Sequence, residues 1–218
     1  MFVQPLYLMS LFISYYINGF LKGEKHVMWK KKIFTIPNLL SVFRIILAII
    51  FLDISVKWGL DEKRKILLII LIISGLTDFL DGKIARKFNM ISELGKILDP
   101  IADKLTQGVL LISFLHEYKM AKYVLILFLI KETYMGVMGL KTVSLTRKNE
   151  GAMWYGKVST AFFYITMILL FLVPQISDCF AEGMICVCGI LMLMALILYD
   201  KYYRKLQNDV NVEKKQAG

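Results

Sequence analysis

Six long apolar runs dominate the sequence, and most of them approach the length that crosses a lipid bilayer. They lie at residues 36–56, 66–80, 97–115, 123–140, 158–173 and 183–199. A membrane-spanning helix needs about 20 predominantly apolar residues, because the hydrocarbon core is about 30 Å thick. The chain is 57% hydrophobic, whereas an average soluble domain is about 45–50% apolar. We therefore expect an all-α, integral membrane six-helix bundle.

The apolar part of the chain reads as one domain, because it contains only four prolines and no Ser/Gly/Pro-rich linker. We divide the chain into a juxtamembrane segment (residues 1–35), a six-span domain (36–203) and a tail (204–218). The first twenty residues are apolar and aromatic but have no basic residue ahead of them, which argues against a cleaved signal peptide. We expect an interfacial amphipathic helix there. The alternatives are a seventh span and a translation start at Met28.

Basic residues are distributed unequally between the two sides of the spans. The segment before the first span, the connections after the second and fourth spans, and the tail hold 18 Lys and Arg together, whereas the opposite segments hold six. The positive-inside rule then places both termini on the cytoplasmic side. This asymmetry, with contact to anionic lipid head groups, explains the net charge of +10 without any nucleic acid.

Four aspartates interrupt the apolar pattern near the cytoplasmic ends of the second and third spans. The first group places two acids and two small residues on one helical stripe, at i, i+3, i+4 and i+7: Asp78, Asp81, Gly82 and Ala85. The second group places three residues on one stripe, at i, i+4 and i+8: Gly95, Asp99 and Asp103. The second apolar run is short, so its helix should continue through residues 81–87. A short polar turn follows, and the two acidic stripes should therefore meet at one membrane depth.

Four carboxylates in a region of low dielectric are costly unless cations neutralise them. Clustered carboxylate oxygens are ligands that Mg²⁺ and Mn²⁺ prefer. Two divalent ions would balance the four charges, and two-metal sites clamp the attacking and leaving oxygens in phosphoryl displacement. Solvated end groups at a span boundary are the simplest alternative. A divalent-cation transporter is another, although its pathway needs polar residues in the outer halves of the spans, which hold almost none.

The complete pattern resembles the signature of the CDP-alcohol phosphotransferases. It reads D-x2-D-G-x2-A-R-x8-G-x3-D-x3-D over residues 78–103, with all eight fixed positions filled. The stretches IPNLLSVFRI, LDPIADK and YGKVST resemble the phosphatidylglycerophosphate synthase branch of that family, so the resemblance covers about residues 36–173. KETYM departs from the branch, which usually has Arg-Glu where this chain has Lys131 and Glu132. The charge is kept, but the planar fork of arginine is lost.

The resemblance implies an enzyme of phospholipid biosynthesis in a bacterial cell membrane, and a homodimer. It would transfer a phosphatidyl group from CDP-diacylglycerol to sn-glycerol 3-phosphate, and CMP would leave. The implied ligands of Mg²⁺ or Mn²⁺, two ions per site, are Asp78, Asp81, Asp99 and Asp103. Asp103 would also be the general base on the acceptor hydroxyl. The positions implied to bind CDP-diacylglycerol are Asp78, Asp81, Gly82, Ala85, Arg86 and Gly95, with Arg86 on the diphosphate.

An acceptor that carries its own phosphate needs a basic pocket. Arg44, Lys131 and Lys157 lie in or near the cytoplasmic ends of the first, fourth and fifth spans and are candidates for it. Snorkelling of these side chains to lipid head groups is the alternative. Other acceptors within the same family stay open: phosphatidylglycerol, as in a cardiolipin synthase, and then the acceptors of phosphatidylinositol-phosphate or phosphatidylserine synthases.

Overall fold

Helices make up nearly all of the part of the chain that the computed structural model describes, which is residues 35–88, 90, 92, 94–146 and 153–216. The elements are α2 (Ile36–Lys87), α3 (Gly95–Ser113), α4 (Lys119–Thr146), α5 (Trp154–Leu172) and α6 (Asp178–Gln216). Because α2 consists of two helices, these residues form six helical segments and no strand, which confirms the all-α prediction. The expected N-terminal interfacial helix and Met28 lie outside the described residues.

Three segments are long and apolar enough to cross a membrane by length and composition: Ile36–Leu60, Trp154–Leu172 and Asp178–Asp209. The second, third and fourth predicted spans do not qualify among the described residues. In the second and third, the aspartates and their basic neighbours interrupt the apolar runs. Large apolar side chains are nevertheless exposed along the second half of α2, including Ile69, Ile72 and Leu76. Such exposure suits contact with lipid. The protein is an integral membrane protein.

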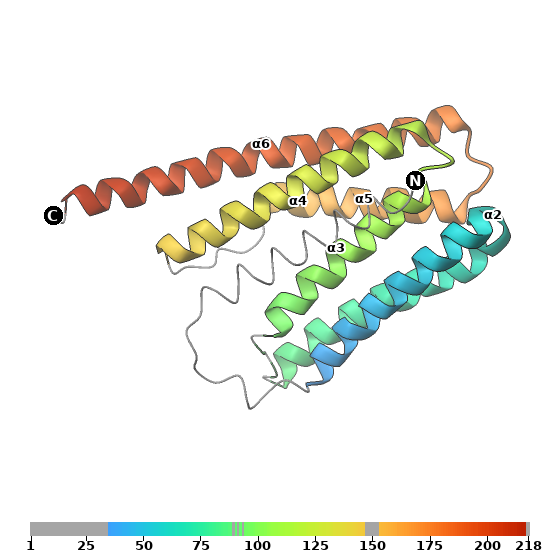
Figure 1. Ribbon diagram of the computed structural model, residues 1–218, viewed down its shortest axis with the longest axis horizontal. Helices are drawn as coiled ribbons and strands as arrows, with labels where there is room; N and C mark the ends of the chain where they lie inside the picture. The colour runs from blue at the N-terminus through green and yellow to red at the C-terminus, as the bar shows by residue number, and fades with distance from the viewer. Residues whose placement is uncertain (1–34, 89, 91, 93, 147–152, 217–218) are drawn as a thin grey trace. The chain divides into compact units, whose positions relative to one another are not determined.

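A single glycine turns the chain between the two halves of α2, residues 36–58 and 60–87. Gly59 has φ 71° and ψ 172°, with helical backbone on both sides. A side chain with a Cβ is strained at such a φ, so glycine suits the position. The sequence predicted a longer connection over residues 57–65. The helix persists there because most of residues 61–65 are good helix formers. Figure 1 shows the two halves side by side.

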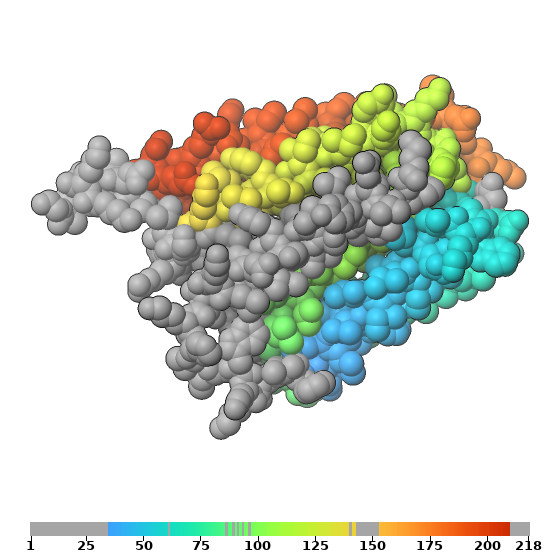
Figure 2. Space-filling view, in the orientation of Figure 1, coloured from blue at the N-terminus to red at the C-terminus, as the bar shows by residue number. Residues whose placement is uncertain are grey.

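The second half of α2 continues past its apolar run to Lys87, as predicted. Its last turn is closed by the Phe88 N–H, which donates to the Ile84 carbonyl at 3.0 Å. The first half lies at the surface of the molecule in Figure 2, and apolar side chains such as Leu39 and Ile49 are exposed along it. Both halves thus present apolar surface outward.

One of the two units of the chain comprises residues 24–122 and 168–175, with α2 and α3 as its main elements. Phe171, near the end of α5, contacts the ring of Phe51 at 5.6 Å and that of Phe114 at 4.9 Å between centroids. Arg64 donates to the Leu170 carbonyl at 2.7 Å, which satisfies one of the carbonyls left open at a helix end. These contacts fix the end of the α2 hairpin that contains the glycine turn.

The other unit comprises residues 1–23, 123–167 and 176–218, and its described helices are most of α4, α5 and α6. A Cβ added to Gly189 in α6 would lie 3.1 Å from the side chain of Val124 in α4, so glycine permits close packing there. Tyr134 of α4 donates a hydrogen bond to Asp200 of α6. Residue numbers rise together along both helices, and α4 therefore runs parallel to α6, as Figure 1 also shows.

Two buried polar side chains hold the N-terminus of α3 against the first half of α2. The Gly95 N–H donates to Ser92 Oγ at 2.9 Å, and the Ser92 hydroxyl donates to Asn38 Oδ1 at 2.7 Å. The N-cap residue, Leu94, supplies no side-chain bond, so Ser92 satisfies a donor of the first turn instead. A Cβ on Gly95 would lie only 2.8 Å from Asn38 Oδ1. Glycine is therefore what allows this contact.

Gly95→Ala should lower the thermal unfolding midpoint in detergent, because the new methyl group displaces the Asn38 amide. We expect a cost of about 1–3 kcal/mol, the usual range for overpacking. In an Asn38→Ala background the same substitution should cost clearly less, and a double-mutant cycle measures the difference. Gly75→Ala is the matched control, since nothing lies within 4 Å of a Cβ at that position. Strictly additive effects of Gly95→Ala and Asn38→Ala would contradict this account.

Candidate active site

All four aspartates of the signature meet around one arginine. Asp78 and Asp81 come from the second half of α2, Asp99 and Asp103 from α3, and Arg44 from the first half of α2. Arg44 Nη1 donates to Asp78, and to Asp103 at 2.6 Å. Nη2 donates to Asp81 at 3.0 Å and lies 3.7 Å from Asp99. The predicted convergence of the two acidic stripes is confirmed.

The cluster is closed on one side and open on the other. The Arg44 side chain is only 2% exposed, and that of Asp81 is also buried, whereas the side chains of Asp78, Asp99 and Asp103 are 53%, 46% and 42% exposed. A buried guanidinium needs charged partners, because a buried charge without them is costly. Here one cation faces four carboxylates, so the group keeps a negative charge that a ligand can approach from the exposed side.

Three polar residues at every third position near the start of α2 face the N-terminal part of α3. Ser41 Oγ lies 3.0 Å from the Pro37 carbonyl oxygen and also hydrogen bonds with the Asp99 carboxylate. Asn38, Ser41 and Arg44 are all buried. The sequence analysis named only Arg44 and missed Asn38 and Ser41. The signal that reveals them is three polar residues at helical spacing within an otherwise apolar run.

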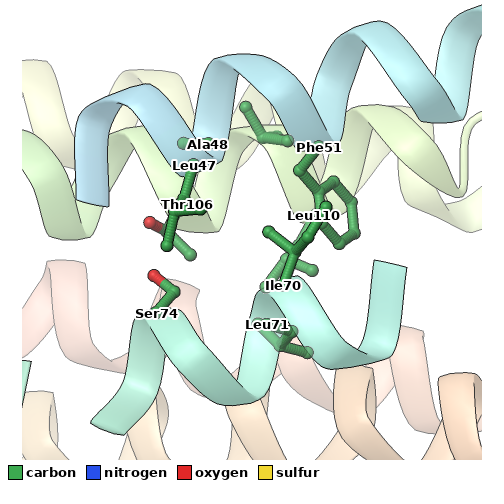
Figure 3. A pocket seen from close by; sticks show the side chains of 9 residues that line it. Leu47, Ala48, Phe51, Ile70, Leu71, Ser74, Thr106 and Leu110 are labelled. Atoms are coloured by element: carbon green, nitrogen blue, oxygen red, sulfur yellow. The ribbon is translucent and has the colours of Figure 1, made fainter. Parts of the chain in front are cut away.

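A small cavity lies next to the aspartates, about one helical turn deeper between the two halves of α2 and α3. Its lining residues are Leu47, Ala48, Phe51, Ile70, Leu71, Ser74, Thr106, Val109 and Leu110. Ser74 precedes Asp78 by four residues and Thr106 follows Asp103 by three. Figure 3 shows both hydroxyls at the same end of the cavity, among apolar side chains. The lining holds no charged side chain, so this wall strengthens electrostatic interactions inside the cluster.

Other residues predicted to bind the nucleotide lie beside the cluster. Gly82 and Ala85 follow on the second half of α2 and are partly exposed. Arg86 lies in the last turn of the same helix, and its side chain lies outside what the structure describes. The space above Gly95 holds Asn38 and not an open groove. A direct role of these residues in nucleotide binding stays a prediction.

The predicted acceptor pocket is divided between the two units of the chain. Arg44 belongs to the unit of α2 and α3 and contacts the aspartates. Lys131 and Lys157 belong to the other unit. Lys131 is buried and forms an ion pair with its neighbour Glu132, whereas Lys157 is exposed near the start of α5. The binding of an acceptor phosphate by these three residues stays a prediction.

The donor set of the cluster suits a hard divalent cation, but its arrangement is that of a guanidinium site. Four carboxylates offer the oxygen ligands that Mg²⁺ and Mn²⁺ prefer. Among the described residues, no three carboxylate, imidazole or thiolate groups are placed to hold one ion in common. Arg44 Nε, although buried, has no hydrogen-bond partner there. The donor chemistry thus fits such ions, whereas the carboxylate positions follow Arg44.

One family model covers the whole of this region, and relatives match parts of the chain. A family model described as CDP-alcohol phosphatidyltransferase matches residues 34–199. The CDP-diacylglycerol–glycerol-3-phosphate 3-phosphatidyltransferase of Rickettsia felis is 38% identical over 98 residues, 44% of this chain and 53% of the relative. The protein of the same name from Aquifex aeolicus is 33% identical over 135 residues, 61% of this chain and 73% of the relative.

A third relative carries a different name. The cardiolipin synthase (CMP-forming) of Streptomyces coelicolor is 42% identical over 76 residues, 34% of this chain and 35% of the relative. The chain thus spans about a third of the Streptomyces protein and about half of the Rickettsia protein. The family model, by contrast, extends over most of the chain and includes every residue of the aspartate cluster. The chain therefore belongs to the CDP-alcohol phosphatidyltransferase family.

Proposed function

We propose that the protein transfers a phosphatidyl group from CDP-diacylglycerol to sn-glycerol 3-phosphate and releases CMP. The observation that carries this proposal is the convergence of the four signature aspartates in one partly exposed cluster. The names of the Rickettsia felis and Aquifex aeolicus relatives support this acceptor. The Streptomyces coelicolor relative favours a second candidate, a cardiolipin synthase with phosphatidylglycerol as the acceptor.

In the proposed reaction, the oxygen of the acceptor hydroxyl forms a bond to the phosphorus that carries diacylglycerol. The bond between that phosphorus and the bridging oxygen breaks, and CMP leaves with the electron pair. Asp103 takes the proton of the acceptor hydroxyl, a role for which its partly exposed carboxylate is accessible. Arg86 holds the diphosphate, since a guanidinium can bind phosphate oxygens in pairs.

We further propose that Asp78, Asp81, Asp99 and Asp103 hold Mg²⁺ or Mn²⁺, two ions per site. Bound there, the ions would supply positive charge beside the diphosphate. The chemistry of the donors supports this assignment, and so does the charge of the cluster. One arginine offsets only one of four carboxylates, so an anionic substrate would otherwise meet net negative charge.

The setting that we propose follows the distribution of basic residues. Both termini and the aspartate cluster lie on the cytoplasmic side of a bacterial cell membrane, where Lys and Arg are concentrated. The phosphate of the acceptor is bound by Arg44, Lys131 and Lys157, and two copies of the chain form a homodimer. Bacterial relatives support the bacterial membrane.

Release of CMP from CDP-diacylglycerol tests the reaction and its acceptor together. With the purified protein in detergent and Mg²⁺ or Mn²⁺, we expect CMP to form with sn-glycerol 3-phosphate and to stop when EDTA is added. Formation with phosphatidylglycerol and not with glycerol 3-phosphate would favour the second candidate. Full turnover in excess EDTA, with the protein shown to be metal-free, would refute the metal assignment. No CMP with any acceptor would refute the reaction.

Asp99 and Asp103 offer a matched pair, because they lie one turn apart on α3 and are similarly exposed. Asp103→Asn should lower kcat by about two to four orders of magnitude, the usual effect of removing a general base. The variant should still bind Mn²⁺ and CDP-diacylglycerol, because the other three aspartates of the cluster remain. Asp99→Asn should weaken Mn²⁺ binding directly. Initial rates and calorimetric titrations separate the two roles, and equal loss of Mn²⁺ in both variants would remove Asp103 as the base.

A further inference from the structure

Arg44 makes contacts with the aspartates that a divalent cation would also need. Its two terminal nitrogens reach all four carboxylates, none farther than 3.7 Å. A lone pair that accepts an N–H bond cannot ligate an ion at the same time. Each carboxylate has further lone pairs, however, so the guanidinium and an ion compete for the negative charge of the same four aspartates.

The guanidinium is only partly satisfied where it lies. Nε is buried and has no hydrogen-bond partner among the described residues. A buried donor without a partner costs free energy, so this position is not an optimal one for an arginine. Its terminal nitrogens are held by the aspartates, and Asp78, Asp99 and Asp103 are exposed enough for an ion to reach them from outside.

The charges of the cluster favour an exchange of cations. With Arg44 alone, four carboxylates carry an excess of three negative charges, which attracts further cations. Two divalent ions would reverse the sign of the group and leave one positive charge in excess. The attraction that holds Arg44 in place would then be lost, because the carboxylates would already be neutralised.

We propose that Arg44 is a built-in competitor for the metal site. It holds the four aspartates together in the metal-free protein and withdraws from them when divalent ions bind. The inference rests on the metal site proposed above. The apparent Kd for the ion is then the intrinsic Kd divided by the fraction of molecules in which Arg44 has withdrawn. Arg44 is thus a positioning residue that sets the metal affinity.

Mn²⁺ titration of an Arg44→Gln variant tests this role without any substrate. Electron paramagnetic resonance of free Mn²⁺ gives the Kd in detergent, and we expect binding about tenfold tighter than in the wild type. The metal-free variant should also unfold at a lower temperature, because its carboxylates repel one another. Saturating Mn²⁺ should raise its unfolding midpoint by more than that of the wild type.

A Lys104→Gln variant is the control, since it removes a positive charge beside Asp103 without removing the guanidinium. The Kd of this variant for Mn²⁺ should change by less than about threefold, because Lys104 is only half-buried and its charge is partly screened by solvent. Weaker or unchanged Mn²⁺ binding in Arg44→Gln would overturn the proposal. A purely structural Arg44 would show that result, with equal loss of stability with and without Mn²⁺.

Arg44→Lys keeps the charge but makes fewer simultaneous hydrogen bonds, and it serves if the neutral variant does not fold. We expect this variant to bind Mn²⁺ more tightly than the wild type and less tightly than Arg44→Gln. If the Kd of Arg44→Lys for Mn²⁺ were unchanged or higher, Arg44 would not compete with the ion. The proposed metal site would still hold in that case. No Mn²⁺ binding by the wild type would instead overturn the metal site itself, and the competition with it.

Discussion

One arginine is the point at which three helical segments are joined through charge. Arg44 comes from the first half of α2, Asp78 and Asp81 from the second half, and Asp99 and Asp103 from α3. Without the Arg44 guanidinium, the buried Asp81 carboxylate would lose its ion-pair partner, and an unpaired buried charge is strongly destabilising. The cluster is therefore both the candidate active site and a set of ion pairs that holds three helical segments together within an otherwise apolar unit.

The sequence predicted the acidic stripes correctly because helical periodicity is a local property. The spacing of Asp78 and Asp81, and of Asp99 and Asp103, already places each pair on one face. The partner of these acids was not predicted, since Arg44 was assigned to an acceptor pocket on the basis of its depth alone. The basic residue that faces a given acidic helix face depends on how separate helices pack. The sequence of either helix alone does not determine this packing.

The helices were predicted more reliably than their ends. Six apolar runs gave six helical segments among the described residues, yet the connection expected over residues 57–65 is a one-residue turn at Gly59. Apolar length marks where a segment leaves lipid, whereas polar helix formers can extend it into water. Asn38 and Ser92 were missed for a related reason. Their hydrogen bond joins residues far apart in sequence, and only the close approach of α3 at Gly95 brings them together.

The one-residue turn at Gly59 fixes the register between the two halves of α2. Arg44 precedes it by fifteen residues and Asp78 follows it by nineteen, with helix on both sides. A flexible loop could accommodate an inserted residue without moving its ends. The continuous helices between Arg44 and Asp78 cannot do so. One inserted residue would advance a half by about 1.5 Å and rotate its far end by about 100°. The aspartate stripe would then point away from its arginine, so the spacing of charges across the hairpin is set by counting residues from one glycine.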